Sequence, residues 1–218
     1  MGFAMRTVNP DPDHLDLTAV IPNWNGGALL HAALASLASQ TGVSLDTIVV
    51  DNGSDPAELR ALAEVAPWAR IVSLGQNRGF AVACNAGIRE AKARFVLTLN
   101  NDARLAPDYC ARLVARLDAD DNLAAAQGLV LDDEGQRVDS AGIVWSERGE
   151  ALQILNRQPL PAIGEPFQVA GVSATAAVYR VAAISSLDGG RLFDEGLFAY
   201  YEDADASLRL LRVGWAFA

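Results

Sequence analysis

The sequence predicts an α/β domain in which helices flank a mostly parallel sheet. Four short apolar runs alternate with three segments of helical spacing between residues 17 and 99, and this alternation is typical of parallel βαβ units. Each of these apolar runs ends in polar residues, and parallel strands place their carboxyl ends at one edge of a sheet. Hydrophobic residues make up 51% of the chain and charged residues 20%, so the chain can bury a core and is not a disordered segment.

The first two strands are each followed by a helix signal. A strand at residues 17–21 runs into the breaker cluster at 22–27, and leucine and alanine then repeat at helical spacing from Leu29 to Leu37. The second strand, residues 47–50, ends in a polar turn. In that turn Asp55-Pro56 predicts a helix start, because aspartate is a common N-cap and proline suits the first helical position.

The next two strands also end in polar residues. The third, residues 70–74, meets Gln76-Asn77-Arg78-Gly79, and the helix after it is rich in alanine and glycine, which allows close packing on a sheet. The fourth, residues 95–99, ends in Asn100-Asn101-Asp102. A buried strand that delivers oxygen-bearing side chains to its carboxyl end puts them where open α/β sheets bind ligands. Taken alone, the triplet also fits a polar turn, because Asn and Asp favour turns.

The remaining part of the chain is less regular. Glycine, proline and alternating residues at 132–166 indicate hairpins and loops, and the last residues, 214–218, look like the beginning of a strand, so we expect the chain to continue beyond Ala218. The other predicted elements are a helix at 107–118, a fifth strand at 124–131, a small-residue segment at 169–179, a short helix at 181–187 and a last helix at about 203–213.

Charge and composition exclude several classes of function. Seventeen Lys and Arg against 27 Asp and Glu give a net charge of -10, which argues against a nucleic-acid partner. Arg180 interrupts the longest apolar run, residues 169–184, so we expect no transmembrane segment of about 20 residues. Residues 1–16 lack the apolar centre of a signal peptide and are expected to form a loose leader. We therefore expect a cytoplasmic protein, for which peripheral association with a membrane stays open.

Five groups of residues, in order along the chain, give a more specific resemblance. They are Val20-Ile21-Pro22-Asn23-Trp24-Asn25; Val50-Asp51-Asn52-Gly53-Ser54; Asn77-Arg78-Gly79-Phe80 with Asn85-Ala86-Gly87; Asn100-Asn101-Asp102; and the acidic segment Phe193-Asp194-Glu195, Phe198-Ala199-Tyr200, Glu202-Asp203, Leu208-Arg209 and Gly214. Together they resemble a family 2 glycosyltransferase of the GT-A type, and most closely its bacterial rhamnosyltransferase-like members. The resemblance implies a GT-A (Rossmann-like) sheet with a smaller mixed portion on the acceptor side. It implies one domain at 17–218, with a nucleotide-sugar-binding half at 17–131 and an acceptor and catalytic half at 132–218.

The resemblance also implies where the donor binds. The donor-binding residues are Pro22, Asn23, Trp24, Asp51, Asn52, Arg78, Asn100 and Asn101. Trp24 offers a stacking face to the nucleobase, and the Arg78 guanidinium suits a phosphate oxygen, although a solvated arginine at a helix start is an equal alternative. The family usually has a carboxylate where Asn52 stands, so the identity of the base does not follow from this position.

A divalent cation and a base complete the implied chemistry. Asp102 stands at the position of the family's metal-binding Asp-X-Asp motif, where Mg²⁺ or Mn²⁺ would stabilise the leaving diphosphate as a Lewis acid. Asn101 contributes no charge, which weakens this metal site. Asp203 matches the family's base in a single displacement with inversion, and Glu202 would support it. Carboxylates at a helix start are also favoured by capping and by the helix dipole, which is the structural alternative.

The expected protein is an inverting, metal-dependent glycosyltransferase. It would move a sugar, with rhamnose as one candidate, from a nucleoside-diphosphate donor to a hydroxyl of a saccharide or lipid-linked acceptor in surface polysaccharide synthesis. The first alternative is a sugar-phosphate nucleotidyltransferase, but Asn25-Gly26-Gly27-Ala28 lacks the basic residue of that class. The second alternative is a non-catalytic nucleotide-sugar-binding module.

Overall fold

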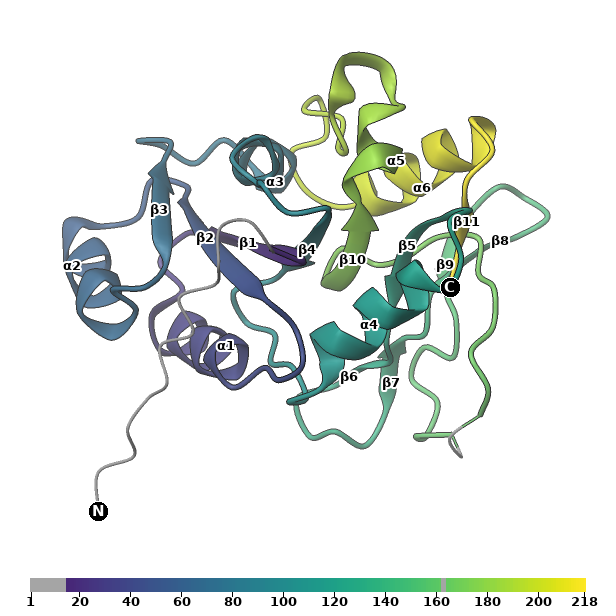
Figure 1. The fold of residues 1–218 in the computed structure, drawn as a ribbon, viewed down its shortest axis with the longest axis horizontal. Helices are drawn as coiled ribbons and strands as arrows, with labels where there is room; N and C mark the ends of the chain where they lie inside the picture. Colours follow the sequence, from purple (N-terminus) through teal and green to yellow (C-terminus); the bar gives the residue numbers. More distant parts are fainter. Residues whose placement is uncertain (1–14, 162–163) are drawn as a thin grey trace.

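The computed structural model describes residues 15–161 and 164–218 of the chain (Figure 1). Most of the predicted leader, residues 1–14, lies outside this description. A seven-stranded sheet has the order β11-β5-β10-β4-β1-β2-β3, and every pairing in it is parallel except the two that β10 makes. The predicted α/β fold with a mostly parallel sheet is therefore confirmed. The strands are β1 (Leu17–Asn23), β2 (Leu45–Asp51), β3 (Arg70–Ser73), β4 (Phe95–Leu99), β5 (Leu123–Gln127), β10 (Ala176–Arg180) and β11 (Ala216–Phe217).

Helices cover both faces of this sheet (Figure 1). They are α1 (Gly27–Ala38), α2 (Pro56–Val65), α3 (Phe80–Arg89), α4 (Tyr109–Asp118), α5 (Val181–Ser185) and α6 (Glu202–Arg212), with a short 3₁₀ turn at Asp188–Gly190. Leucines of α1 and α4 pack on one face with Leu17 and Ile21, whereas α3 packs on the other face with Val20. Because both faces are buried, β1 and β4 are mostly apolar, as parallel strands usually are, and their polar residues Thr18, Asn23 and Thr98 are buried as well. No helix in the described part of the chain is long and apolar enough to cross a membrane.

The Asn85-Ala86-Gly87 motif has a packing role. A Cβ atom on Gly87 would lie 2.4 Å from Cγ1 of Val20 and 2.9 Å from Cγ2 of Val50, so glycine is what allows α3 to lie this close to β1 and β2. The buried Asn85 side chain donates to the carbonyl of Phe193 (2.8 Å) and accepts from its N–H (3.1 Å). This pair of hydrogen bonds ties α3 to the segment that leads into α6.

The predicted fifth strand is wrong in its extent. The sequence favoured one strand at 124–131, but β5 ends at Gln127, and Val130–Leu131 (β6) pairs with Val138–Ser140 (β7) in a separate hairpin. The break falls at Gly128, whose N–H donates to the Tyr109 hydroxyl (3.0 Å) and where a Cβ would lie 2.6 Å from the Tyr109 ring. Tyr109 thus diverts the chain out of the main sheet. A second hairpin follows, formed by β8 (Ile143–Trp145) and β9 (Ala151–Gln153).

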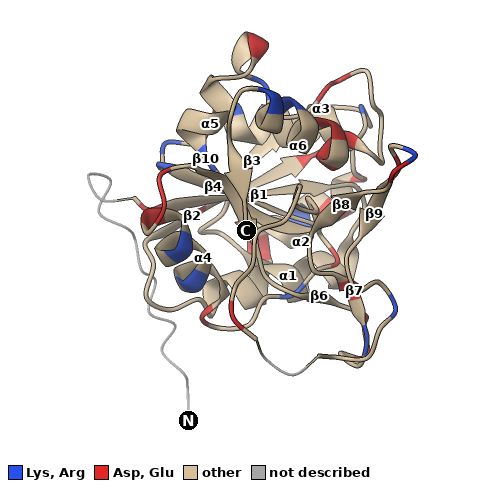
Figure 2. Cartoon of the chain, turned by 90° about the vertical axis from the view of Figure 1, so that its right-hand side faces the viewer, with Lys and Arg blue, Asp and Glu red and all other residues tan. Residues whose placement is uncertain are grey.

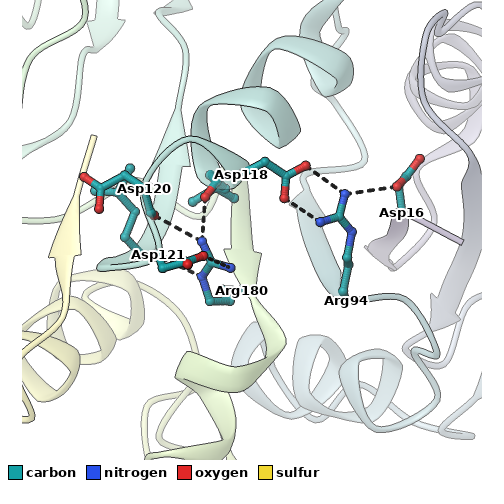
Figure 3. Close-up of polar contacts among 8 residues, drawn as sticks. Asp16, Arg94, Asp118, Asp120, Asp121 and Arg180 are labelled. Carbon is teal, nitrogen blue, oxygen red and sulfur yellow. Dashed lines mark hydrogen bonds and ion pairs between the residues drawn. The ribbon is translucent and has the colours of Figure 1, made fainter.

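Two arginines organise the amino ends of the central strands (Figure 3). Arg94, directly before β4, pairs with Asp16 (3.2 Å) and, through both terminal nitrogens, with Asp118. Arg180, which interrupts the apolar run of the sequence, donates to the carbonyl of Leu117 (2.6 Å) near the end of α4. Cations near a helix C-terminus satisfy carbonyls that have no partner within the helix. This charged cluster therefore stabilises the edge of the sheet opposite to the carboxyl ends of the strands.

Candidate active site

The carboxyl edge of the sheet gathers polar residues from several strands. Asn23 at the end of β1 is in register with Asp51 at the end of β2. Asn100, directly after β4, donates its N–H to the carbonyl of Thr175 (2.9 Å), just before β10 begins. The strand ends that the sequence predicted to lie together are thus neighbours in the structure.

Two asparagines of the predicted donor site contact each other. The side-chain oxygen of Asn23, Oδ1, accepts from the Asn101 side-chain amide (2.9 Å) and from the N–H of Gly26 (3.2 Å). Beside them, Glu58 of α2 accepts from the N–H of Gly27 (2.9 Å) at the start of α1. These contacts join the ends of β1 and β4 and fix the loop between β1 and α1. No motif in the sequence pointed to Glu58.

Asp51 and Asn52 hold the loops that follow β2 and β3. Asp51 is 1% exposed, and its two oxygens accept from the N–H of Ser54 (2.8 Å) and from the Ser73 hydroxyl (2.8 Å). The Asn52 oxygen accepts from the N–H of Arg78 (2.8 Å). Both side chains therefore hold the loops at this edge of the sheet, and their contact with a nucleobase stays a prediction.

The remaining residues predicted to bind the sugar donor or the metal are exposed or half-buried at the same edge. Trp24 is 58% exposed, Arg78 and Asp102 are exposed, and Pro22 is half-buried. Within the described residues, neither charged group of Arg78 or Asp102 makes an ion pair or a side-chain hydrogen bond. An indole face, a cation and a carboxylate are thus all available to a ligand.

An open pocket of about 660 Å³ lies beside this edge. It brings Asn100 together with Glu202 and Asp203, which begin α6; Figure 2 shows the acidic first turn of α6 next to the β8–β9 hairpin. No sequence pattern pointed to four polar residues of its wall, because they lie in irregular segments or in strands of only three residues. These are Asp139, Gln153, Ser173 and Thr175.

Asp203 is held by the loop before β10 as well as by its own helix. Its carboxylate accepts from the N–H groups of Ala174 (3.3 Å) and Ala204 (2.8 Å), while Tyr201 occupies the cap position of α6. Burial raises the pKa of Asp203, and these two hydrogen bonds act in the opposite direction. A carboxylate with a raised pKa is a stronger proton acceptor than an ordinary aspartate.

Glu202 is more buried than Asp203, with 7% of its surface exposed. One of its carboxylate oxygens, Oε2, has no hydrogen-bond partner in the described part of the chain. Burial raises the pKa of Glu202, and the neighbouring Asp203 charge adds to that effect. The two adjacent acids therefore share a site in which negative charge is disfavoured.

The segment before α6 is strained and joined to the donor side. Tyr200 and Tyr201 have φ of 70° and 66°, and consecutive left-handed residues other than glycine are uncommon outside functional regions. The Phe198 carbonyl accepts from the N–H of Phe80 (2.7 Å), and a Cβ on Gly79 would lie 2.4 Å from that carbonyl oxygen. The loop after β3 is thus in contact with the segment that carries the predicted base.

Comparison with known proteins identifies the family. The family described as "Glycosyl transferase family 2" matches residues 18–187, which is most of the chain. The chain belongs to this family. The resemblance seen in the sequence motifs is therefore confirmed, and the carboxyl edge with its pocket is the candidate active site of a family 2 glycosyl transferase.

Relatives of this family 2 glycosyl transferase include two proteins of bacterial polysaccharide or lipid-linked sugar synthesis. The succinoglycan biosynthesis protein ExoO of Rhizobium meliloti is 34% identical over 105 residues, which cover 48% of this chain and 30% of ExoO. The N-acetylglucosaminyl-diphospho-decaprenol L-rhamnosyltransferase of Mycobacterium tuberculosis is 26% identical over 222 residues, which cover 91% of this chain and 71% of the relative.

Solved structures share the fold. A mannosyltransferase from Pyrobaculum calidifontis, solved in complex with GDP-Man and Mn²⁺, aligns with a TM-score of 0.66 and 21% identity over 97% of this chain and 56% of that chain. S. aureus TarS 1-349 aligns with a TM-score of 0.62 and 17% identity, covering 94% of this chain and 60% of that chain. These alignments confirm the GT-A fold that the sequence predicted.

Proposed function

We propose that the chain transfers a sugar from a nucleoside-diphosphate donor to a hydroxyl of a saccharide or lipid-linked acceptor, with inversion at the anomeric carbon. The observation that carries this proposal is the pocket in which the half-buried Asp203 carboxylate lies beside the carboxyl edge of the sheet. Family membership favours this function over the nucleotidyltransferase and the non-catalytic module. The succinoglycan and rhamnosyltransferase relatives support surface polysaccharide synthesis as the setting, and rhamnose as the first sugar to test.

The exposed residues of the edge suit a nucleoside diphosphate. We assign stacking on the nucleobase to the Trp24 indole and contact with a phosphate oxygen to the Arg78 guanidinium. Both side chains are exposed on the same side of the sheet as Asp203, the predicted catalytic base. The hydrogen-bonded pair of Asn23 and Asn101 would form the floor between these two contacts.

Asp102 is the residue that would hold a divalent cation. It is exposed and keeps both carboxylate oxygens free of protein partners within the described residues. No cluster of three or more His, Cys, Asp or Glu in the described part could hold a metal by itself. A single carboxylate thus fits Mg²⁺ or Mn²⁺ bound mainly through diphosphate and water, because such a cation needs only one or two protein oxygens. Such a cation, when bound, supplies Lewis-acid stabilisation of the leaving diphosphate.

Asp203 would act on the acceptor. The acceptor oxygen attacks the anomeric carbon as the bond to the diphosphate breaks, and the hydroxyl proton passes to the Asp203 carboxylate. The raised pKa of Asp203 favours its acceptance of that proton. Glu202, directly beside it and buried, would support the site, and its own pKa is raised by burial and by the Asp203 charge.

Thermal unfolding with nucleotides tests the donor part of this proposal. At about 100 times Kd, a nucleotide that binds only the folded chain adds about 2.7 kcal/mol of stability, or roughly 5–11 °C in Tm for a chain of this size. We expect this shift with dTDP, UDP or GDP in the presence of Mn²⁺. Asp102→Asn should remove the effect of Mn²⁺ on nucleotide binding, whereas Asp133→Asn, which removes an exposed carboxylate elsewhere, should not. The proposal is wrong if none of these nucleotides shifts Tm with or without Mn²⁺.

A further inference from the structure

A chain of hydrogen bonds runs behind the pocket and fixes the orientation of one side chain in its wall. The N–H of Ser173 donates to the Gln127 oxygen (2.5 Å). Because a backbone N–H can only donate, this contact identifies the oxygen of the Gln127 amide and leaves its nitrogen as the other atom. That nitrogen donates to the Ser140 hydroxyl (3.1 Å).

The next step of the chain determines the amide of Gln153. The Ser140 oxygen also accepts from the N–H of Gly142 (3.1 Å), so two donors point at it and its own hydrogen is left to donate. It lies 2.6 Å from Gln153 Oε1, which accepts that hydrogen. The Gln153 amide nitrogen, Nε2, makes no hydrogen bond within the described residues, and the half-buried side chain lines the pocket. Gln153 therefore has two N–H donors without a partner in the described residues, in the lining of the pocket.

The charges of the pocket restrict what that ligand can be. Three carboxylates line it, those of Asp139, Glu202 and Asp203, and its described lining contains no Lys, Arg or His. A phosphate or carboxylate of a ligand would be repelled here, because like charges at short range repel one another. A neutral ligand rich in hydroxyl groups can instead donate to these carboxylates and accept from Gln153. The exposed rings of Tyr200 and Tyr201, which also line the pocket, suit the apolar face of a pyranose.

We propose that the acceptor end that enters this pocket is a neutral sugar, and that Gln153 selects it by donating a hydrogen bond from Nε2 to one of its oxygens. This inference rests on the proposed function, since it describes the acceptor of that reaction. Gln153 is a specificity-determining residue in it and takes no part in the bond changes. The three carboxylates act in the same direction by disfavouring an anionic sugar.

Binding of simple glycosides tests the inference. The chain, loaded with the nucleotide and Mn²⁺ that stabilise it best, is titrated by saturation-transfer NMR with octyl glucoside, octyl galactoside, octyl rhamnoside and octyl glucuronide. We expect at least one neutral glycoside to bind, and octyl glucuronide to bind at least tenfold more weakly than octyl glucoside. Gln153→Glu keeps the oxygen that accepts from Ser140 but replaces the free N–H donors, so the neutral glycoside should bind about tenfold more weakly, within the range for one lost hydrogen bond.

Gln158→Glu is the matched control, because it makes the same charge change at an exposed position outside the pocket lining; its affinities should equal those of the parent chain. Three results would each overturn the inference: equal affinity of the Gln153→Glu and parent chains for the neutral glycosides, equal binding of glucuronide and glucoside, or no glycoside bound by the parent chain. Nucleotide binding is measured in the same samples. If the nucleotide binds and one of the three results is found, only the inference about the acceptor is wrong, whereas absent nucleotide binding counts against the proposed function itself.

Discussion

Asp203→Asn tests the proposed chemistry most directly, because the amide keeps the size of the side chain but cannot take up the acceptor proton. A general base contributes about 10²- to 10⁴-fold to rate, or about 2.7–5.4 kcal/mol of transition-state stabilisation. A base that acts only on the acceptor contributes little to donor binding. We therefore expect release of nucleoside diphosphate from the donor sugar to fall at least a hundredfold while nucleotide affinity stays unchanged.

The structure also gives the expected effect on stability. In the parent chain, the N–H groups of Ala174 and Ala204 each donate to a different carboxylate oxygen of Asp203. The amide of the variant has only one oxygen, so one of these hydrogen bonds is lost, which costs about 1 kcal/mol. The amide carries no charge, so the variant avoids the free-energy cost of burying a charge, which is the cost that raises the pKa of Asp203. An acid with a raised pKa in the folded state stabilises the fold at low pH and loses that contribution as pH rises through the folded pKa, so at neutral pH only the parent carries the burial cost. These opposing effects leave the free energy of unfolding within about 1 kcal/mol of the parent, or about 4 °C in Tm.

Rate against pH gives an independent readout. If Asp203 is the base, it must be ionised to accept the proton, so the rate of transfer should rise with pH through its pKa. Since burial raises that pKa, this rise should lie above the usual range of aspartate. The Asn variant should lack it.

Asp205→Asn is the control, because it removes a carboxylate from the same helical turn. Asp205 pairs with Arg209 (2.7 Å), and loss of this part-exposed pair costs at most about 1 kcal/mol. If Asp203→Asn releases nucleoside diphosphate about as fast as Asp205→Asn, the base lies elsewhere and Asp203 has only a structural role.

Two further predictions concern the donor edge and the packing of α3. Trp24→Ala should weaken nucleotide binding by about 1–3 kcal/mol in calorimetric titration if the indole stacks on the base, with little change in Tm because Trp24 is 58% exposed; unchanged affinity would contradict stacking. Asn85→Leu should leave the buried N–H and carbonyl of Phe193 without partners, at about 1–3 kcal/mol for each group. Urea unfolding would show this loss of stability, and a change below about 1 kcal/mol would contradict the argument.

Much of the fold follows from local patterns in the sequence. The alternation of apolar strands with helical segments predicts β1 to β4 and α1 to α3, because each element buries residues at its own period. Polar residues at the strand ends predict a binding edge, because parallel strands all end on the same side. The motif residues have identifiable reasons in the structure, as Gly87 shows by its approach to Val20. Local chemistry was sufficient for these conclusions.

The pocket depended on contacts between distant segments. Strand β10 lies antiparallel between β4 and β5, and nothing local in residues 169–179 indicated that position. Strands β7 to β9 have three residues each, which is too short for a period to be recognised. The free donor of Gln153 depends on a hydrogen-bond chain through Gln127 and Ser140. Sequence patterns report which face of its own element a residue occupies, whereas a pocket wall depends on which elements meet, and only tertiary packing decides that.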